Sequence, residues 1–281
     1  MIRVLCSGGL GNQMFQYAFF RRLQLNNEDV ILDTSFFVHN TVHSGYELNK
    51  CFGFSDNVVT HNFFNHFWRG IYFVMSKLNV GKFMNIIIEK QGEKLDLSHL
   101  TGREIMYGYW QTEEYFSDYK ELIIKELSFI NLSNKSINIS KQMASENSVA
   151  IHVRRGDYLL ASQYVNLGNT NYYHNAIDYI KENVNNPKYY VFSDDINWCK
   201  KNLDIPKDSM FVDFNTGNRS YEDMFLISCC KYAVVANSSF SWWGGYLGNH
   251  DFVLRPEKYK VKWDEKQDSF LYPKEWVKIE V

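Results

Sequence analysis

Apolar runs and turn residues follow one another along this chain in the order expected for alternating strands and helices. Ile2 to Cys6 is a short apolar run that leads into a glycine loop, Ser7 to Gly11, and apolar residues then recur at roughly helical spacing as far as Leu25. Val30 to Asp33 is the next apolar run and has the length and composition of a buried strand. The N-terminal part therefore predicts a strand, a glycine loop, a helix and a second strand.

The second half repeats this pattern more regularly. Ser148 to Val153 is short, apolar and rich in β-branched residues, which is typical of a buried strand. Further elements are predicted in alternation, with helices near 172–182, near 221–230 and from 239, and strands at 189–192, 232–236 and 252–254. Alternation of this kind predicts an α/β fold with a mostly parallel sheet and helices on both faces.

A change in composition separates the two halves. Residues 131–147 contain three Asn-x-Ser sequences, several other serines and few large apolar side chains, which indicates a linker. A length of 281 residues allows one large or two ordinary domains. We therefore predict an N-terminal domain over 1–140 and a C-terminal domain over 141–281, with an aromatic strand that runs into a helix over 104–119.

Composition narrows the function classes. Hydrophobic residues make up 45% of the chain and charged residues 22%, which is ordinary for a globular protein, and a net charge of -2 argues against wholesale nucleic-acid binding. The five cysteines show no CxxC spacing, which favours a reducing compartment and argues against zinc. The apolar N-terminal run is too short for a signal peptide and no run is long enough to cross a membrane, so we expect a cytoplasmic location.

Residues 56–89 have an unusual character. No acidic residue lies between Asp56 and Glu89, and Arg69, Lys77 and Lys82 stand among many aromatic residues. This pattern fits a peripheral contact with the inner membrane face, but it favours a helical core hairpin whose polar edge is basic. Liposome flotation would distinguish the two interpretations.

Polar residues occur where the predicted strands of the second half end. Arg154 and Arg155 follow Ser148 to Val153, and two guanidinium groups at the carboxyl end of a parallel strand can hold a diphosphate, because arginine matches phosphate oxygens bidentately. Ser238 and Ser239 stand at a turn from strand to helix, where hydroxyls and free helical N–H groups would bind phosphate. The alternative for these serines is simple helix capping.

Carboxylates accompany the same strand ends. Asp194, Asp195 and Asp223 are candidates to accept the N–H groups of a guanine edge, and each is also a candidate to cap a helix or to pair with an arginine. In the glycine loop, the backbone can approach a ligand closely, with a tight turn capped by Asn12 as the alternative. The loop lacks the GxGxxG spacing of dinucleotide folds.

Metal chemistry has little support in the sequence. No aspartate has another aspartate two positions away, so the Asp-x-Asp pattern common in metal-dependent nucleotide-sugar enzymes is missing. His39 and His43 are four apart but lack the zincin glutamate. We therefore expect no metal site, with Arg154 and Arg155 supplying the positive charge that a cation would otherwise bring.

Four stretches resemble, in their order along the chain, the motifs of bacterial α-1,2-fucosyltransferases, glycosyltransferase family 11. They are Gly8 to Ala18 (GGLGNQMFQYA), His152 to Tyr158 (HVRRGDY), Phe192 to Asp195 (FSDD) and Asn237 to Gly244 (NSSFSWWG). The resemblance implies a GT-B fold, in which two Rossmann-like domains face each other across a cleft, and a donor, GDP-fucose, held mainly by the second domain. It thins out between residues 34 and 100, where acceptor specificity is expected to lie.

The resemblance also implies roles for single residues. The residues expected to bind the donor are His152, Arg154 and Arg155 at nucleotide and pyrophosphate, Asp223 at guanine, Ser238 and Ser239 at phosphate, Asn12 at fucose and β-phosphate, and Asp194 and Phe240 within the matching motifs. The implied reaction is inverting transfer of L-fucose from GDP-β-L-fucose to the 2-hydroxyl of a β-galactoside, on an oligosaccharide or lipid-linked acceptor, in synthesis of an O-antigen-like surface glycan.

In that reaction the arginines would stabilise the charge that develops on the departing β-phosphate. Asp157 is the acid nearest to them in sequence and is a candidate general base, although it is equally a candidate to brace Arg154. A fucosyltransferase of another linkage is the main alternative function. A dinucleotide oxidoreductase and an adhesion protein that uses Arg155-Gly156-Asp157 are weaker alternatives, as is a non-catalytic nucleotide-binding protein.

Overall fold

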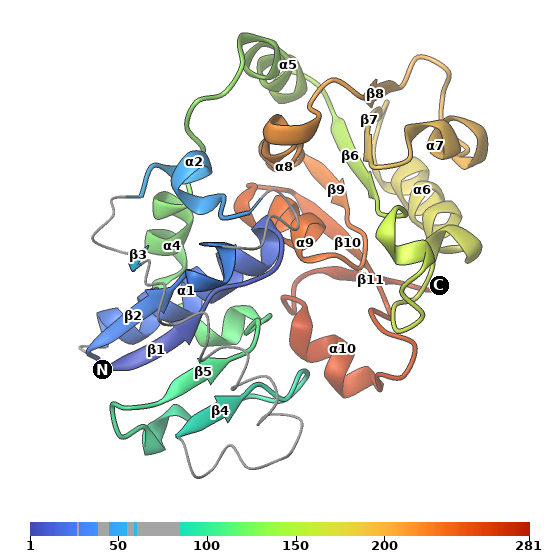
Figure 1. Ribbon diagram of the computed structural model, residues 1–281. Helices are drawn as coiled ribbons and strands as arrows, with labels where there is room; N and C mark the ends of the chain where they lie inside the picture. The colour runs from blue at the N-terminus through green and yellow to red at the C-terminus, as the bar shows by residue number, and fades with distance from the viewer. Residues whose placement is uncertain (27, 39–44, 55–58, 61–84) are drawn as a thin grey trace. The chain divides into compact units, whose positions relative to one another are not determined.

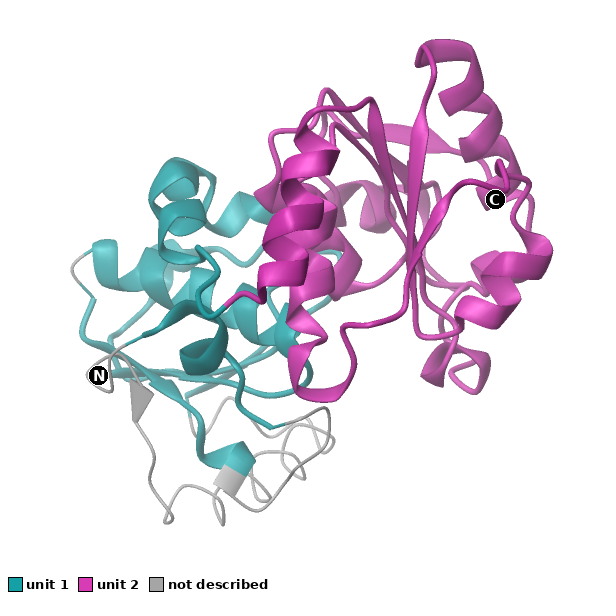
Figure 2. Ribbon diagram, turned by 90° about the horizontal axis from the view of Figure 1, so that it is seen from above, with its two compact units in different colours: residues 1–131 teal, residues 132–281 magenta. Residues whose placement is uncertain are grey.

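The computed structural model describes residues 1–26, 28–38, 45–54, 59–60 and 85–281. Figure 2 shows that the chain divides into two compact units, Met1–Asn131 and Leu132–Val281. His39, His43 and most of the basic aromatic stretch lie outside the described residues, so the two interpretations of that stretch stay open.

The boundary between the units differs from the predicted one. The chain divides after Asn131, whereas residue 140 lies inside helix α5 (Asn134–Ala144) of the second unit. Ile139 and Met143 are buried one turn apart on this helix, which packs against helix α8 (Tyr221–Ser228). Because few of its residues are apolar, the composition of α5 resembles that of a linker although its buried face is helical.

The first unit contains a parallel sheet in the order β3-β2-β1-β5-β4 (Figure 1). The strands are β1 (Ile2–Leu5), β2 (Val30–Asp33), β3 (Val59–Thr60), β4 (Ile86–Ile88) and β5 (Ile105–Tyr107), and its described helices are α1 (Leu10–Leu25), α2 (Leu48–Phe52) and α4 (Lys120–Glu126). Most side chains of α1 are buried, and Phe19 on this helix stacks on Trp110 with ring centroids 4.5 Å apart. The aromatic content of the chain is thus used partly in this core.

The second unit contains a parallel sheet in the order β11-β10-β9-β6-β7-β8. The strands are β6 (Ser148–Val153), β7 (Lys188–Ser193), β8 (Met210–Val212), β9 (Tyr232–Val234), β10 (Phe252–Pro256) and β11 (Val277–Ile279), and the helices not yet given are α6 (Tyr172–Asn183), α7 (Ile196–Asn202), α9 (Ser239–Leu247) and α10 (Glu265–Leu271). Counted from β6, this is the strand order 3-2-1-4-5-6 of a Rossmann fold, in which the direction of winding reverses between the first and fourth strands. Here the reversal falls between β6 and β9.

Alternation along β6 assigns its side chains to the two faces of the sheet. Ile151 and Val153 pack in the core that includes Tyr172 and Ile177 of α6. Because successive side chains of a strand point to opposite faces, His152 points the other way, and its ring lies 5.5 Å from the ring of Phe240 on α9. One residue of α9 thus packs beside the strand that leads into the two arginines.

The predicted fold class is confirmed: both units are α/β with parallel sheets. Within the described residues, no helix is both long enough and apolar enough to span a bilayer. All five cysteines are free, and Cys229 is the one that is not fully buried.

Candidate functional site

Three neighbouring strands of the second unit deliver the predicted polar residues to one edge of the sheet. β6 pairs in parallel with β7 on one side and with β9 on the other. Their carboxyl ends therefore lie side by side, and the segments that follow them begin with Arg154, Asp194 and Val235. In open α/β sheets the place where the winding reverses is where ligands bind, since the adjacent loops diverge there.

The two arginines of this edge are held by carboxylates. Arg154 pairs with Asp157 at 2.7 Å, through Nη2 and Oδ1, and with Asp194 at 3.0 Å, through Nη1 and Oδ2. Arg155 pairs through Nε with Asp195 at 3.2 Å, and its guanidinium lies 4.2 Å from the ring centroid of Trp198. The guanidinium groups are thus fixed before any ligand arrives, which reduces the entropy lost on binding.

Asp194 and Asp195 fill the structural roles that were alternatives to ligand binding. Asp194 accepts the backbone N–H of Arg155 at 2.9 Å, and Asp195 caps α7 by accepting the N–H of Trp198 at 3.0 Å. Gly156 allows this arrangement, because a Cβ at that position would lie 2.8 Å from Oδ2 of Asp194. The loop after β6 and the start of α7 thereby form one connected unit around the arginines.

His152 is buried and electrically neutral at physiological pH. Burial is the main reason that its pKa falls from the ordinary value to about 4; the charge of Asp194 opposes this shift and that of Arg154 adds to it. Its Nδ1 atom is buried without a hydrogen-bond partner among the described residues. Such an atom is available to a ligand that enters this edge of the sheet, as a neutral donor or acceptor and not as a cation.

The serine turn, Ser238 and Ser239, lies at the start of α9. The N-cap residue is Ser238 and not Ser239, but the Ser238 side chain makes no capping hydrogen bond. Both predicted roles, phosphate binding and helix capping, therefore stay open for the Ser238 hydroxyl. The first turn of a helix leaves backbone N–H groups without helical partners and carries a partial positive charge. An anion between the Arg154 side chain and this turn would therefore meet favourable electrostatics from both strand ends.

Asp223 lies in the first turn of α8, which packs against α9. Its Oδ1 accepts a hydrogen bond from Nδ2 of Asn215 at 2.9 Å. Burial raises the pKa of Asp223 to about 7, and the charge of Glu222 adds to this effect while the hydrogen bond from Asn215 opposes it. A carboxyl group poised in this way changes protonation readily when a ligand presents N–H donors to it.

In the first unit, the glycine loop and the segment after β5 form a second polar arrangement. Gly8 has φ of +81°, which side chains rarely adopt, and a Cβ there would lie 2.8 Å from Nδ2 of Asn12. Oδ1 of Asn12 accepts a hydrogen bond from Nε2 of Gln111 at 2.7 Å. The N-cap of α1 is Gly9, so the alternative role of Asn12 as the cap is wrong.

Two glutamine side chains of α1 hold the glycine loop and the segment after β5 in place through hydrogen bonds. Gln16 accepts the N–H of Ser7 at 2.9 Å and donates to the carbonyl of Gly108 at 2.8 Å, so it joins the segments that follow β1 and β5. Gln13 donates to the carbonyls of Gly8 and Gly45. Both glutamines are fully buried, and a buried amide that satisfies backbone groups in this way holds a loop rigidly.

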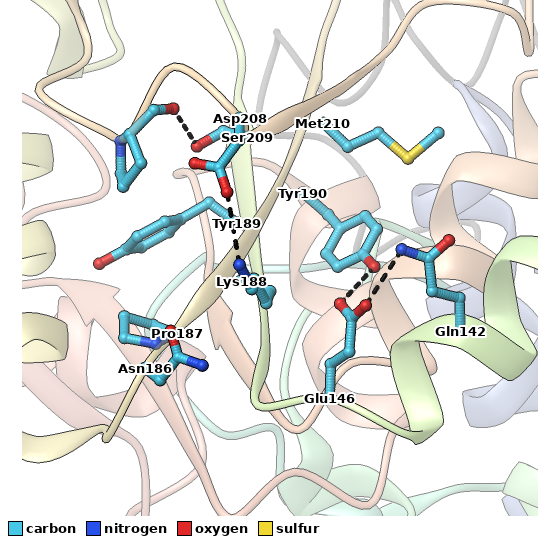
Figure 3. Close-up of a pocket in the computed structure, with 11 residues that line it drawn as sticks. Gln142, Glu146, Asn186, Pro187, Lys188, Tyr189, Tyr190, Asp208, Ser209 and Met210 are labelled. Carbon is cyan, nitrogen blue, oxygen red and sulfur yellow. Dashed lines mark hydrogen bonds and ion pairs between the residues drawn. The ribbon is translucent and has the colours of Figure 1, made fainter.

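A separate cavity of about 360 Å³ lies in the second unit, and Figure 3 shows the residues that line it. It lies at the amino ends of β7 and β8, since Lys188 and Met210 are the first residues of those strands. Its polar lining groups bind one another: the hydroxyl of Tyr190 donates to Glu146 at 2.8 Å, and Lys188 pairs with Asp208 at 3.3 Å. It is at the opposite edge of the sheet from the arginines and takes no part in the candidate site.

Metal ligands do not gather in the described part of the chain. No group of three or more His, Cys, Asp or Glu side chains there is placed to hold an ion. Metal independence stays a prediction, because it concerns the reaction and not only the ligands.

Comparison with known proteins decides the family. The family model described as glycosyl transferase family 11 matches residues 1–280. The chain belongs to this family. It is 35% identical to an alpha-1,2-colitosyltransferase of Escherichia coli, over 98% of this chain and 97% of that protein. It is 29% identical to WbnK, an O-antigen biosynthesis glycosyltransferase of Escherichia coli, over 90% of this chain and 93% of that one.

Two more distant similarities extend this result. Galactoside alpha-(1,2)-fucosyltransferase 1 of Mico humeralifer is 30% identical over 47% of this chain and 38% of its own length. Among solved structures, Arabidopsis thaliana FUT1 in its R284K form with GDP matches with a TM-score of 0.52 at 12% identity, over 97% of this chain and 74% of that one. The second match supports the fold alone, which agrees with the GT-B assignment of this glycosyltransferase.

The structure therefore gathers most of the predicted residues. His152, Arg154, Arg155, Asp157 and Asp194 are connected around the end of β6, with Phe240 packed on His152. Asn12 lies in the other unit, in the first turn of α1 directly after the glycine loop. Trp198 and Asn215 were missed, because the sequence gives no sign that they contact Arg155 and Asp223 across intervening elements.

Proposed function

We propose that this glycosyltransferase transfers L-fucose, with inversion, from GDP-β-L-fucose to the 2-hydroxyl of a β-galactoside. Membership of family 11 and the α-1,2 linkage in the names of two relatives support the linkage. The observation that carries the proposal is the pair of pre-positioned arginines where the winding of the second sheet reverses, beside a helix whose capping residue makes no side-chain cap bond. We further propose that it acts in the cytoplasm and that its product is part of a surface glycan. The words O-antigen biosynthesis in the name of WbnK support the second part of this proposal.

The arginine loop, Arg154–Asp157, supplies the electrostatic part of the mechanism. As the bond between the fucose anomeric carbon and the β-phosphate oxygen breaks, the electron pair stays on the phosphate. Arg154 and Arg155 stabilise this growing charge more strongly than the charge of the intact donor, which lowers the barrier. The N–H groups at the start of α9 add to the same effect, and His152 contributes a neutral hydrogen bond.

The acceptor hydroxyl attacks the opposite face of the anomeric carbon and forms the new glycosidic bond, so a β-linked donor gives an α-linked product. Its proton must pass to a base. Asp157 is 52% exposed and is engaged by Arg154, an arrangement that favours a role in bracing the arginine. The departing phosphate is then the simplest proton acceptor, because it gains charge as the hydroxyl loses its proton.

A colitosyl donor is the second candidate, because the relative with 35% identity is named for transfer of that sugar. The two donors place the same demands on Arg154 and Arg155 and differ only in the sugar. The specificity would then be set on the side of Asn12, which is proposed to reach the sugar.

The test is an assay of the purified chain with GDP-fucose and GDP-colitose against a panel of β-galactosides, with the linkage determined by NMR. We expect a fucosylated product linked α-1,2. Transfer from GDP-colitose alone would show that the proposed donor is wrong, and a product with a different linkage would show that the proposed acceptor hydroxyl is wrong. No transfer from either donor to any galactoside would refute the proposal.

A further inference from the structure

A chain of buried and half-buried polar groups runs from the start of α5 to Asp223. Ser133, the N-cap residue of α5, donates to Oε2 of Glu222 at 2.5 Å, and the N–H of Ser136 donates back to Oγ of Ser133 at 3.1 Å. The hydroxyl of Ser136 lies 3.5 Å from Oδ1 of Asn215, whose Nδ2 donates to Asp223 at 2.9 Å. Three residues, Ser133, Ser136 and Asn215, thus connect two adjacent carboxyl groups by a path outside α8.

The pKa values of the two carboxyl groups at the ends of this path are shifted in opposite directions. Burial opposes ionisation of Glu222, but hydrogen bonds from Ser133 and Ser136 and the charge of Arg219 hold its pKa below the ordinary value. In the described part of the chain, Asn215 is the hydrogen-bond donor to Asp223, and burial raises the pKa of Asp223 to about 7. Neighbouring carboxyl groups whose environments separate their pKa values in this way commonly have different roles.

The acceptor atoms of Asp223 suit one class of ligand edge. Each carboxylate oxygen has two lone pairs, so Oδ1 can accept from Asn215 and from a ligand while Oδ2 accepts from the ligand alone. Guanine offers two adjacent N–H donors on its Watson–Crick edge, which fit two carboxylate oxygens. Adenine has an acceptor at the corresponding ring nitrogen, which would face the carboxylate unfavourably.

We propose that Asn215 is a positioning residue that holds the Asp223 carboxylate in the orientation that accepts both N–H groups of guanine, so that binding of a guanine nucleotide is coupled to loss of a proton from Asp223. The inference rests on the proposed function, since it assumes a guanine-linked donor. Asn215 suits this role because its side chain is 7% exposed and cannot rotate freely away from Asp223. A fixed amide also keeps the carboxylate from turning toward Glu222 or water.

Few other charges reach Asp223. Glu222 is the charged neighbour that raises its pKa, and Arg219 is engaged by Glu222. On α5, Lys135 lies over the ring of Phe214 at 3.5 Å, and Lys141 is one to two turns further along. α9 carries no charged side chain, and His152 is the titratable residue of β6. The pH dependence of guanine binding between about pH 6 and 8 should therefore follow Asp223.

The experiment measures binding of GDP and of ADP to the full chain by calorimetry from pH 5.5 to 8.5. ADP has the same diphosphate, so effects of phosphate titration appear with both nucleotides and cancel in their ratio. For the wild type we expect a preference for GDP that is full above about pH 7 and declines as the pH falls, because a protonated Asp223 loses an acceptor. Asp223→Asn should lower GDP affinity by about 10- to 100-fold and remove this pH dependence.

Asn215→Ala should lower GDP affinity by about tenfold, change ADP affinity by less than about twofold, and move the midpoint of the pH dependence upward, since the hydrogen bond that favours ionisation is lost. Asn215→Asp, which keeps the size of the side chain, should move the midpoint further upward by adding a like charge. Thr216→Ala, the neighbouring exposed position, is the matched control and should behave as wild type.

Equal losses for both nucleotides with an unmoved midpoint would mean that Asn215 has a merely structural role, and unchanged GDP binding in Asn215→Ala would also overturn the inference. Either result leaves the proposed donor intact. If the wild type bound no GDP at any pH, both the inference and the proposed function would fail, so the two failures are distinguishable.

Discussion

Arg155 contacts three different chemical groups. Its Nε pairs with Asp195, its guanidinium stacks on Trp198, and its backbone N–H donates to Asp194. The side chain is 11% exposed, and Nη1 is buried without a hydrogen-bond partner among the described residues. An arginine fixed on one side, with a donor left over, is suited to meet an anion without rearrangement.

Arg155→Ala should therefore reduce transfer by about 10²- to 10³-fold, because one charge-assisted donor to the leaving phosphate is lost. The measurement is kcat/KM for the donor, with circular dichroism to show that the fold is intact. Arg103→Ala, at an exposed position in the first unit, is the control and should keep normal turnover. Near-normal turnover in a folded Arg155→Ala protein would overturn the assignment of the site.

His152 gives a prediction about stability. Its pKa is about 4 in the folded chain and about 6.5 when unfolded, so it contributes stability that is present above pH 6.5 and is lost as the pH falls toward 4. His152→Gln should be less sensitive to acid than the wild type over this interval, in urea unfolding at pH 7 and pH 5. His174→Gln, at an exposed position on α6, should follow the wild type; equal acid sensitivity in all three proteins would contradict the buried, neutral state of His152.

At the scale of elements, Gly8 and Gly102 form a matched pair. Both have φ of +81°, but a Cβ at Gly8 would lie 2.8 Å from Asn12 Nδ2, whereas nothing lies within 4 Å at Gly102. Gly102→Ala should lower the free energy of unfolding by about 1 kcal/mol through backbone strain alone. Gly8→Ala should lower it further and reduce transfer, because Asn12 must move away from Gln111. Equal losses of stability, with normal transfer, would show that the glycine loop tolerates a side chain.

The sequence predicted the elements whose own residues show a continuous apolar run or a clear helical spacing. β2 and β6 have the predicted bounds, because each is a continuous apolar run, and α6 extends to Asn183 from the predicted start at Tyr172. α7, β8, α10 and β11 were not predicted, since each is seven residues or shorter and has too few apolar positions to show a period.

For the candidate site, the sequence likewise predicted which residues lie near one another but not how they pair. The strand ends placed Arg154, Asp194 and Ser238 on one edge, because parallel strands of a βαβ pattern must end together. The pairing of these groups could not be predicted: Asp194 is 39 residues from the Arg155 N–H that it accepts, and Asn215 reaches Asp223 from a loop with no motif. Only the packing of α7 and α8 determines these contacts.

For the whole molecule, we predict that transfer does not require a metal ion, because arginines supply the positive charge at the proposed donor site. Arg154 and Arg155 already supply two charges, and no cluster of metal-ligating side chains occurs in residues 1–26, 28–38, 45–54, 59–60 and 85–281. EDTA should leave transfer largely unchanged in protein prepared without added metal. A strict requirement for added Mn²⁺, restored in proportion to its concentration, would reject the account based on the arginines alone.

The two units should respond differently to GDP, because all the groups proposed to bind it except Asn12 belong to Leu132–Val281. A ligand that binds the folded state slows the opening of the segments it contacts, so hydrogen exchange should slow at the arginine loop, at the first turn of α8 and at the serine turn before α9. The amide N–H groups of the glycine loop should change less with GDP than with GDP-fucose, since Asn12 is proposed to meet the sugar and β-phosphate. ADP is the control for the base and should give weaker protection at α8 than at the arginine loop. Protection confined to Met1–Asn131 would move the donor to the other unit and refute the site.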